Sequence, residues 1–443
     1  MWRHQARPMV KILIINVMAL YNHGGRAVIK GFIHGVKERV PDAELTFMSS
    51  HYNSERSVYS EWNYDQVKII PHYWFRERKG FVRALLASAI SAPLLFVKMN
   101  LYQIFYKILP LTNPYQEYDV IIDLTTDGPS DNYSLYMTLF SLFNIYLASL
   151  SGKPMLICAA SIGIFKNSIS RNLAKYVLSR VDVITVREVY SMEYLKEIAI
   201  EKPQIYLVAD QAFLMGPASE ERINTIFLKE GLQDLQKPII GITVNHITYR
   251  YAFPEIQDPN EKKRAYNNVT KRLIEHIITT YNATVLLIPH ATGVNYSPEY
   301  DGKALSREIY SNTPGEDRLR MIQGDYDSDE VKGIIGQCDL FFGSRMHSTI
   351  AATSLGVPTI AIVYGHKSHG IIGKMMGQEN CIVEVEKHNP DDLFQELVEK
   401  FDYIWRNQSP IRNELREKTQ ETRKKAFLVG KYLEEIINKN PTG

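Results

Sequence analysis

Short apolar runs alternate with longer amphipathic stretches along the first half of the chain. Apolar runs bounded by turn residues are typical of buried strands, whereas apolar positions three and four residues apart indicate helices. Strands that alternate with helices in this way form a parallel, doubly wound sheet. We predict strands at 10–17, 45–50, 119–124, 155–160, 183–186 and 205–209, and helices at 26–38, 133–150, 169–180 and 191–199.

The same alternation begins again after a polar stretch at 216–237. The pattern predicts strands at 239–244, 284–288, 338–342 and 359–363, helices at 261–281, 327–337 and 350–355, and a charged helical segment at 391–440. The fold class is therefore α/β, with two Rossmann-like domains, a cleft between them and C-terminal helices packing across both. We expect the domains at 1–222 and 223–390, the helical segment at 391–443, and an irregular elaboration of the first domain at 51–114.

Length and composition agree with this organisation and exclude several other classes. A chain of 443 residues suits two domains better than one core. The net charge is +2 with both signs interspersed, which does not indicate a nucleic-acid-binding protein. The three cysteines, Cys158, Cys338 and Cys381, have neither metal-binding nor redox spacing, so we expect a reducing compartment. His366 and His369 lack further ligands nearby, and we expect no metal and no cofactor.

Two apolar segments resemble a signal peptide or a membrane-associated segment. The segment 10–20 lacks a small-residue cleavage site, and we interpret it as a buried strand rather than a signal peptide. The segment 81–97 is too short to span a bilayer, and we expect helices packed on the domain. A membrane-surface patch flanked by Lys98 and Lys107 is the alternative. We therefore expect a cytoplasmic protein, with peripheral attachment to the inner face of the membrane left open.

One strand-to-helix corner carries the strongest chemical signal. Gly343 to Thr349 joins an apolar strand to an apolar helix and contains Arg345, His347 and Ser348. Ligands of open α/β sheets bind beyond the carboxyl ends of the strands, where helix N-termini offer unpaired N–H groups to an anion. We predict that this corner binds a small, densely negative ligand, although a buried core histidine is the alternative for His347.

Residues that follow other strands are further candidates for binding the ligand. Arg187 follows the strand at 183–186 and would grip a second anionic group, unless it pairs with Glu188 or another acid. Lys367 is a third cation beyond a strand end. Asn22 and Gly24 lie in the first strand-to-helix loop, where glycine allows close approach to a ligand.

Two acids follow the strand at 119–124. Asp127 and Asp131 are placed to bind sugar hydroxyls or to act as acid or base; turn formation and helix capping are the alternative. Elsewhere, Asp327 and Glu330 have the spacing of a capping box. The chain has no Walker motif, no Gly-x-Ser-x-Gly elbow and no Gly-x-Gly-x-x-Gly after a strand, which disfavours nicotinamide chemistry.

In several of these motifs the chain resembles the polysaccharide pyruvyl transferase family. The marks are residues 339–348 with Gly356-Val357-Pro358 and Tyr364-x-x-Lys367, supported by segments 160–163, 182–188, 210–213 and Asn22-x-Gly24. The resemblance implies a glycosyltransferase-B-like fold and transfer of a pyruvyl group from phosphoenolpyruvate to sugar hydroxyls as a ketal. It places the donor-binding Arg and His of the family at Arg345 and His347 and the arginine of its Val-Arg-Glu motif at Arg187, and it implies acceptor binding by the N-terminal domain. The chain departs from the family pattern at Thr125–Gly128 and Gly25–Arg26, where an acceptor is expected.

The chemistry of that reaction assigns roles to the candidates. Phosphoenolpyruvate carries a phosphate and a carboxylate on three carbons, which Arg345, Arg187 and Lys367 would balance. His347 would bind phosphate or deliver a proton to the methylene carbon, and Asp127 is our candidate base on the acceptor hydroxyl. Ser348, Asn22, Gly24 and Asp131 complete the expected binding residues. The partners are the donor and a glycan or lipid-linked saccharide. A nucleotide-sugar glycosyltransferase and a non-catalytic glycan- or anion-binding relative are the alternatives.

Overall fold

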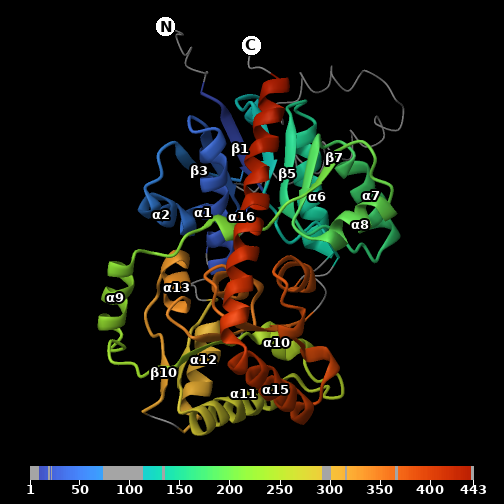
Figure 1. Cartoon of the computed structure of the whole chain (residues 1–443). Helices are drawn as coiled ribbons and strands as arrows, with labels where there is room; N and C mark the ends of the chain where they lie inside the picture. Colours follow the sequence, from blue (N-terminus) through green and yellow to red (C-terminus); the bar gives the residue numbers. More distant parts are fainter. Residues whose placement is uncertain are drawn as a thin grey trace. The chain divides into compact units, whose positions relative to one another are not determined.

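Figure 1 shows the computed structural model of the chain. It describes residues 9–17, 20, 22–72, 113–131, 135–291, 301–314, 317–364 and 368–440. Backbone contacts divide the chain into two compact units. The first comprises Met1–Leu20, Gly35–Val208 and Phe427–Gly443, and the second comprises Tyr21–His34 and Ala209–Ala426.

The first unit contains a seven-stranded parallel sheet in the order β3-β2-β1-β4-β5-β6-β7. Its central strands are buried along almost their whole length, as expected for a sheet covered on both faces. The strands are β1 (Lys11–Ile15), β2 (Glu44–Ser49), β3 (Val67–Pro71), β4 (Val120–Asp123), β5 (Met155–Ala160), β6 (Val183–Val186) and β7 (Gln204–Leu207). The helices are α1 (His23–Arg39, which belongs to the second unit as far as His34), α2 (Tyr52–Trp62), α5 (Asn113–Gln116), α6 (Leu135–Ser149), α7 (Ser168–Leu178) and α8 (Val189–Glu197).

The second unit contains a six-stranded parallel sheet in the order β10-β9-β8-β11-β12-β13. Its strands are β8 (Ile239–Thr243), β9 (Thr284–Leu287), β10 (Leu319–Met321), β11 (Leu340–Gly343), β12 (Thr359–Val363) and β13 (Ile382–Glu384). Its helices are α9 (Glu220–Lys229), α10 (His246–Tyr251), α11 (Pro259–Tyr281), α12 (Gly302–Ser311), α13 (Ser328–Ile335), α14 (Met346–Thr353) and α15 (Pro390–Arg406). The last helix, α16 (Gln408–Lys439), contributes residues to both units.

Each sheet has one point at which the strand order reverses. The reversal lies between β1 and β4 in the first unit and between β8 and β11 in the second. Ligands of doubly wound sheets bind beyond the carboxyl ends of the strands at this point. The topology therefore directs attention to the loops that follow these four strands.

The predicted α/β class with two Rossmann-like sheets is confirmed. The prediction of an irregular stretch at 51–114 is wrong for its described part, because α2, the edge strand β3 and the start of α5 lie in it. Residues 73–112, including the segment 81–97, lie outside the described residues. The predicted cleft and the predicted domain boundaries stay predictions. Within the part of the chain that the structure describes, every helix is too short or too polar to cross a bilayer.

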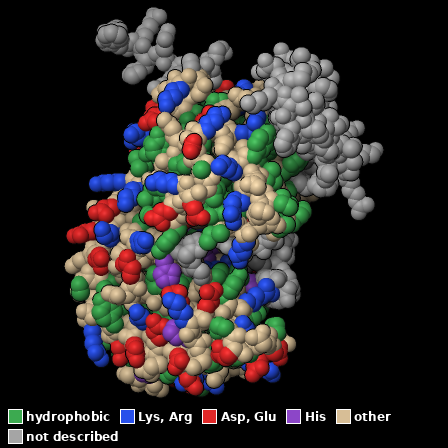
Figure 2. All heavy atoms as spheres, turned by 90° about the vertical axis from the view of Figure 1, so that its right-hand side faces the viewer, with side chains coloured by type: hydrophobic (Ala, Val, Ile, Leu, Met, Phe, Trp, Pro, Cys, Tyr) green, Lys and Arg blue, Asp and Glu red, His purple; other side chains and the backbone are tan. Residues whose placement is uncertain are grey.

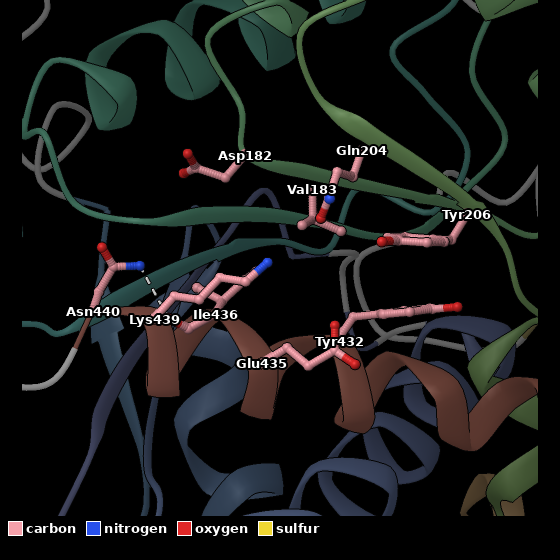
Figure 3. Close-up of a pocket in the computed structure, with 9 residues that line it drawn as sticks. All are labelled: Asp182, Val183, Gln204, Tyr206, Tyr432, Glu435, Ile436, Lys439 and Asn440. Carbon is pink, nitrogen blue, oxygen red and sulfur yellow. Dashed lines mark hydrogen bonds between the residues drawn. The ribbon is translucent and has the colours of Figure 1, made fainter.

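A cavity of about 200 Å³ lies where the end of α16 packs on the first sheet (Figure 3). The ring of Tyr432 stacks on that of Tyr206, with centroids 3.9 Å apart. Asp182, Val183 and Gln204 line the cavity at the amino ends of β6 and β7. This is the end of the sheet opposite to the one at which ligands bind, so we attribute the cavity to helix packing.

Candidate active site

Hydrogen bonds join the loops that follow β8 and β11 at the reversal point of the second sheet. The Ser344 hydroxyl donates to the Thr243 carbonyl at 2.6 Å. The Asn245 amide and the Thr248 hydroxyl both donate to the Ser344 carbonyl at 3.3 Å. Because all four residues are buried, these bonds fix the corner from which Arg345 and His347 project.

Arg345 occupies the N-cap position of α14 in an extended conformation, and its side chain forms no cap hydrogen bond. Its Nε is buried and has no hydrogen-bond partner among the described residues. Ser348 directs its hydroxyl to the Arg345 carbonyl at 2.8 Å and is fully buried. A guanidinium nitrogen left unpaired at a helix N-terminus is a donor available to an anion.

His347 lies in the first turn of the same helix and is 9% exposed. Its Nε2 is 3.7 Å from Oδ2 of Asp210 and has no hydrogen-bond partner in the described part of the chain. Asp210 is buried, and its other oxygen accepts from the Ala212 amide at 2.8 Å, capping a short 3₁₀ helix at Gln211–Leu214. A carboxylate fixed beside an imidazole can orient the ring.

The start of α1 packs directly on this histidine. A Cβ added at Gly24 would lie 2.4 Å from Nδ1 of His347, so only glycine permits the approach. Asn22 accepts from the Gly24 amide at 3.0 Å and forms a bridge with Ala291 beyond β9. The structure thus places Asn22 and Gly24 in the same cluster as Arg345 and His347, all within the second unit.

Three buried histidines surround the pair and were not identified from the sequence. His23 and His290 approach edge to face, with ring centroids 5.4 Å apart, and His246 opens α10 after β8. Nδ1 of His290 has no hydrogen-bond partner among the described residues. Their positions in the sequence could have indicated two of them, because His246 and His290 both follow predicted strands by a few residues.

These histidines are neutral at pH 7 in the free protein. Burial, with Arg26 next, lowers the pKa of His23 to about 3, and burial followed by Arg345 lowers that of His246 to about 3. Burial and then the charges of His23, Arg345 and His347 hold the pKa of His290 well below its usual range. A bound anion would oppose these effects, because a negative charge favours the protonated imidazole.

In the first unit, Arg187 and Asp127 form an ion pair. Arg187 is completely buried at the end of β6, and its Nε donates to the Ser161 hydroxyl at 2.8 Å. Glu188, the partner considered from the sequence, instead caps α8 by accepting from Ser191. Two residues with separate predicted roles thus lie together, and those roles stay predictions.

Asp131 ties two loops of the first unit together. Its Oδ2 accepts from the Ser170 hydroxyl at 2.7 Å and from the Asn167 amide at 3.2 Å, at the start of α7. Lys367 and His366 lie outside the described residues. No group of His, Cys, Asp and Glu suited to a metal occurs within the described ranges.

Asp123 is a further titratable group that the sequence did not single out. It ends β4 at the reversal point of the first sheet and is fully buried. Burial raises its pKa to about 6, although hydrogen bonds from Thr125 at 2.7 Å and Asn16 at 2.5 Å oppose the shift. A carboxyl group that titrates near neutrality at the carboxyl end of a central strand is a candidate for proton transfer.

The family model of polysaccharide pyruvyl transferases matches residues 22–366. The chain belongs to this family. It is therefore a transferase, and the resemblance noted from the sequence motifs is confirmed. Among the candidate residues, the match leaves out only Lys367.

This pyruvyl transferase is also similar to a curated relative and to solved structures. The amylovoran biosynthesis protein AmsJ of Erwinia amylovora is 24% identical over 389 residues, which cover 85% of this chain and 88% of AmsJ. The structure of Anabaena HepE in complex with UDP and glucose has a TM-score of 0.57 at 10% identity, covering 97% of this chain and 99% of HepE. UDP-GlcNAc 2-epimerase from Neisseria meningitidis bound to UDP-GlcNAc has a TM-score of 0.54 at 11% identity, covering 98% and 100%. At such identities the likeness concerns the fold alone, and it confirms the predicted glycosyltransferase-B-like class.

Proposed function

We propose that this pyruvyl transferase uses phosphoenolpyruvate as its donor and forms a pyruvate ketal on two hydroxyls of an exopolysaccharide unit or its precursor. The observation that carries the donor assignment is the cluster beyond β8, β9 and β11. There Nε of Arg345, Nε2 of His347 and Nδ1 of His290 are buried without hydrogen-bond partners among the described residues. Buried polar atoms left unsatisfied are costly, and a phosphate or carboxylate oxygen would satisfy them.

The reaction follows from the electronic structure of the donor. A proton added to the methylene carbon makes C2 electrophilic, and one sugar hydroxyl forms a C–O bond to C2 while losing its proton. The C2–O bond to phosphate then breaks, and the leaving phosphate takes up a proton. A second hydroxyl attacks C2, loses its proton and closes the ketal ring. Two hydroxyls and one donor thus yield one ketal and one inorganic phosphate.

Residues of the second unit fit the donor half of this sequence. Arg345 would bind an oxyanion through its planar donor fork, and the first turn of α14 would supply backbone N–H groups. His347 would deliver the proton to the methylene carbon or hold the phosphate, with its ring oriented by Asp210. Since neutral His23 and His290 gain protons more readily beside an anion, donor binding should strengthen as pH falls.

The acceptor half is proposed for the first unit. Asp127 is the proposed base on the attacking hydroxyl, and its ion pair with Arg187 supports a fixed position for the carboxylate. We propose a glycan or a lipid-linked saccharide as acceptor. The name of the relative AmsJ, an amylovoran biosynthesis protein, supports a role in exopolysaccharide synthesis.

The test is to incubate the full chain with phosphoenolpyruvate and a panel of free and lipid-linked saccharides. We expect phosphate release in equal amount to a product whose mass increases by one pyruvate ketal. Release of nucleotide from a nucleotide sugar, with no ketal formed, would favour a glycosyltransferase. Binding of phosphoenolpyruvate by calorimetry without turnover on any acceptor would favour a non-catalytic binding protein. An Arg345→Ala variant should lose turnover, while Lys271→Ala, at a half-exposed position of α11, should keep it.

A further inference from the structure

The segment from 132 to 181 has an unusual distribution of charge. It contains Lys153, Lys166, Arg171, Lys175 and Arg180 but neither aspartate nor glutamate. It builds α6, β5 and α7 of the first unit. Among the described residues, no carboxylate lies within ion-pair distance of Lys166, Arg171 or Lys175. Lys166, Arg171 and Lys175 therefore carry positive charge that no described carboxylate neutralises.

Helix α7 exposes a second apolar stripe in addition to its buried one. Ser170, Ala174, Val177 and Leu178 face the core. Ile169, Leu173 and Tyr176 have the spacing of one helix face, and they are 72%, 37% and 42% exposed. Arg171 and Lys175, four residues apart, are exposed on the same helix.

Helix α6 buries apolar residues of its later turns, among them Leu142 and Ile145, together with the polar Thr138, Ser141 and Asn144. Its first turns nevertheless expose large apolar side chains. Leu135, Tyr136, Met137 and Leu139 are 46%, 66%, 55% and 36% exposed. A helix that turns apolar groups outward at this density marks an interaction surface rather than ordinary surface composition.

These residues form one surface, which we call the α6–α7 face. It consists of the exposed side chains of Leu135, Tyr136, Met137, Leu139, Ile164, Lys166, Ile169, Arg171, Leu173, Lys175 and Tyr176. Helices α6 and α7 pack side by side (Figure 1). Figure 2, turned toward this side, shows hydrophobic side chains with charged side chains of both signs among them.

We propose that the α6–α7 face docks on the surface of an anionic phospholipid bilayer. Apolar side chains that enter the headgroup region, together with Lys and Arg that contact anionic lipids, are what peripheral membrane binding requires. A second copy of this chain would fit less well, because two such faces would bring their positive charges together. Peripheral binding also agrees with the absence of membrane-spanning helices among the described residues.

Docking in this orientation has a consequence for the acceptor, which rests on the proposed function. The first turns of α6 and α7 follow β4 and β5, so they lie at the carboxyl edge of the first sheet. Asp127 and Arg187 lie at the same edge. A membrane held against this edge would present the sugar of a lipid-linked saccharide to the proposed base.

The test is sedimentation of the full chain with vesicles of phosphatidylcholine, alone or mixed with phosphatidylglycerol. We expect binding to the anionic vesicles that weakens as salt is added. Replacing Lys166, Arg171 and Lys175 together by Gln should weaken it at least tenfold, since each basic residue near the surface contributes about 1 kcal/mol. The pair Ile169→Ser and Tyr176→Ser should weaken binding at low and high salt alike.

A matched control carries Lys424→Gln, Lys425→Gln and Leu228→Ser, which alter exposed residues elsewhere and should bind vesicles like the wild type. Equal sedimentation with neutral and anionic vesicles, or wild-type binding by the α6–α7 variants, would overturn the proposal. So would a dimer that these variants abolish without any change in lipid binding. Vesicle binding by a chain that makes no ketal would refute the proposed function and leave the docking surface intact.

Discussion

Arg345 is the residue on which the donor assignment depends most directly. Its guanidinium is half-buried, with Nε unpaired among the described residues, at the N-terminus of α14. Replacement by Ala should weaken phosphoenolpyruvate binding by about 2–5 kcal/mol, because the buried anion loses its charge partner. Replacement by Lys should recover only part of this loss, since an ammonium lacks the planar fork. Calorimetric titration measures both effects, and an unchanged affinity in Arg345→Ala would remove this residue from the site.

Asp210 acts, in our interpretation, as a positioning residue through His347. In Asp210→Asn the amide oxygen still accepts from Ala212, so the cap is kept while the negative charge beside Nε2 is lost. The turnover number should fall by roughly tenfold to 100-fold, part of what general acid–base catalysis supplies, with little change in KM. The pH–rate profile should shift as well. Loss of stability with turnover per folded molecule unchanged would assign Asp210 a structural role only.

At the scale of elements, the start of α1 shapes the site because Gly24 has no side chain where the helix meets His347. Gly24→Ala would bring a Cβ to 2.4 Å from the His347 ring and force the ring to move. Alanine otherwise favours a helix over glycine by about 1 kcal/mol, so stability should change little while turnover falls strongly. Gly216→Ala is the control, because nothing lies within 4 Å of its added Cβ. Steady-state kinetics and urea unfolding of both variants separate the two effects, and full activity in Gly24→Ala would contradict the packing argument.

The elements that position the site could be predicted wherever a local pattern in one stretch of sequence determines the structure. The corner at Arg345 and His347 lies between β11 and α14 as predicted, and the capping box of Asp327 and Glu330 opens α13. The strands β10 and β13 have three residues each, which is too short for a period to be visible. Helix α6 was predicted from its apolar residues, but the inward direction of its polar ones depends on the sheet beneath it.

The remainder of the site depends on contacts between segments far apart in sequence. His246 and His290 follow β8 and β9 of the second sheet, whereas His23 opens α1 after β1 of the first sheet, and all three lie near Arg345. The pairing of Arg187 with Asp127 rather than Glu188 is of the same kind, because β4 and β6 are separated by β5. Such pairs leave no local pattern that a single sequence reveals.

At the scale of the whole molecule, the two units have similar strand orders but bury different titratable groups. The second unit buries His23 and His246, each with a pKa of about 3. The first unit buries His72 with a pKa of about 4, lowered by burial, and Asp123 with a pKa of about 6. Because a buried neutral histidine and a buried protonated carboxyl respond oppositely to acid, the units should differ in their pH dependence.

The direction of each effect follows from which state holds more protons. Below pH 6.5 an unfolded histidine is protonated while the folded one is not, so acid destabilises the fold by about 2 kcal/mol per histidine at pH 5. For Asp123 the folded state holds the proton between pH 6 and 3.8, so acid stabilises the fold by about 1 kcal/mol at pH 5. His72 and Asp123 therefore largely offset each other in the first unit, whereas the histidines of the second unit add.

We accordingly expect acidification from pH 7 to pH 5 to loosen the second unit by at least about 4 kcal/mol, which His23 and His246 supply and to which His290 adds. The first unit should loosen by less than about 1 kcal/mol. Hydrogen exchange, corrected for intrinsic rates, checks this by comparing peptides from β8 and β11 with those from β1 and β4. Phosphoenolpyruvate should restore protection at pH 5 in the second unit alone, because an anion beside protonated imidazoles stabilises the charged form. Equal loosening of both sheets would contradict the pKa assignments. Equal protection of both sheets by the donor would show that its binding is not confined to the histidine cluster.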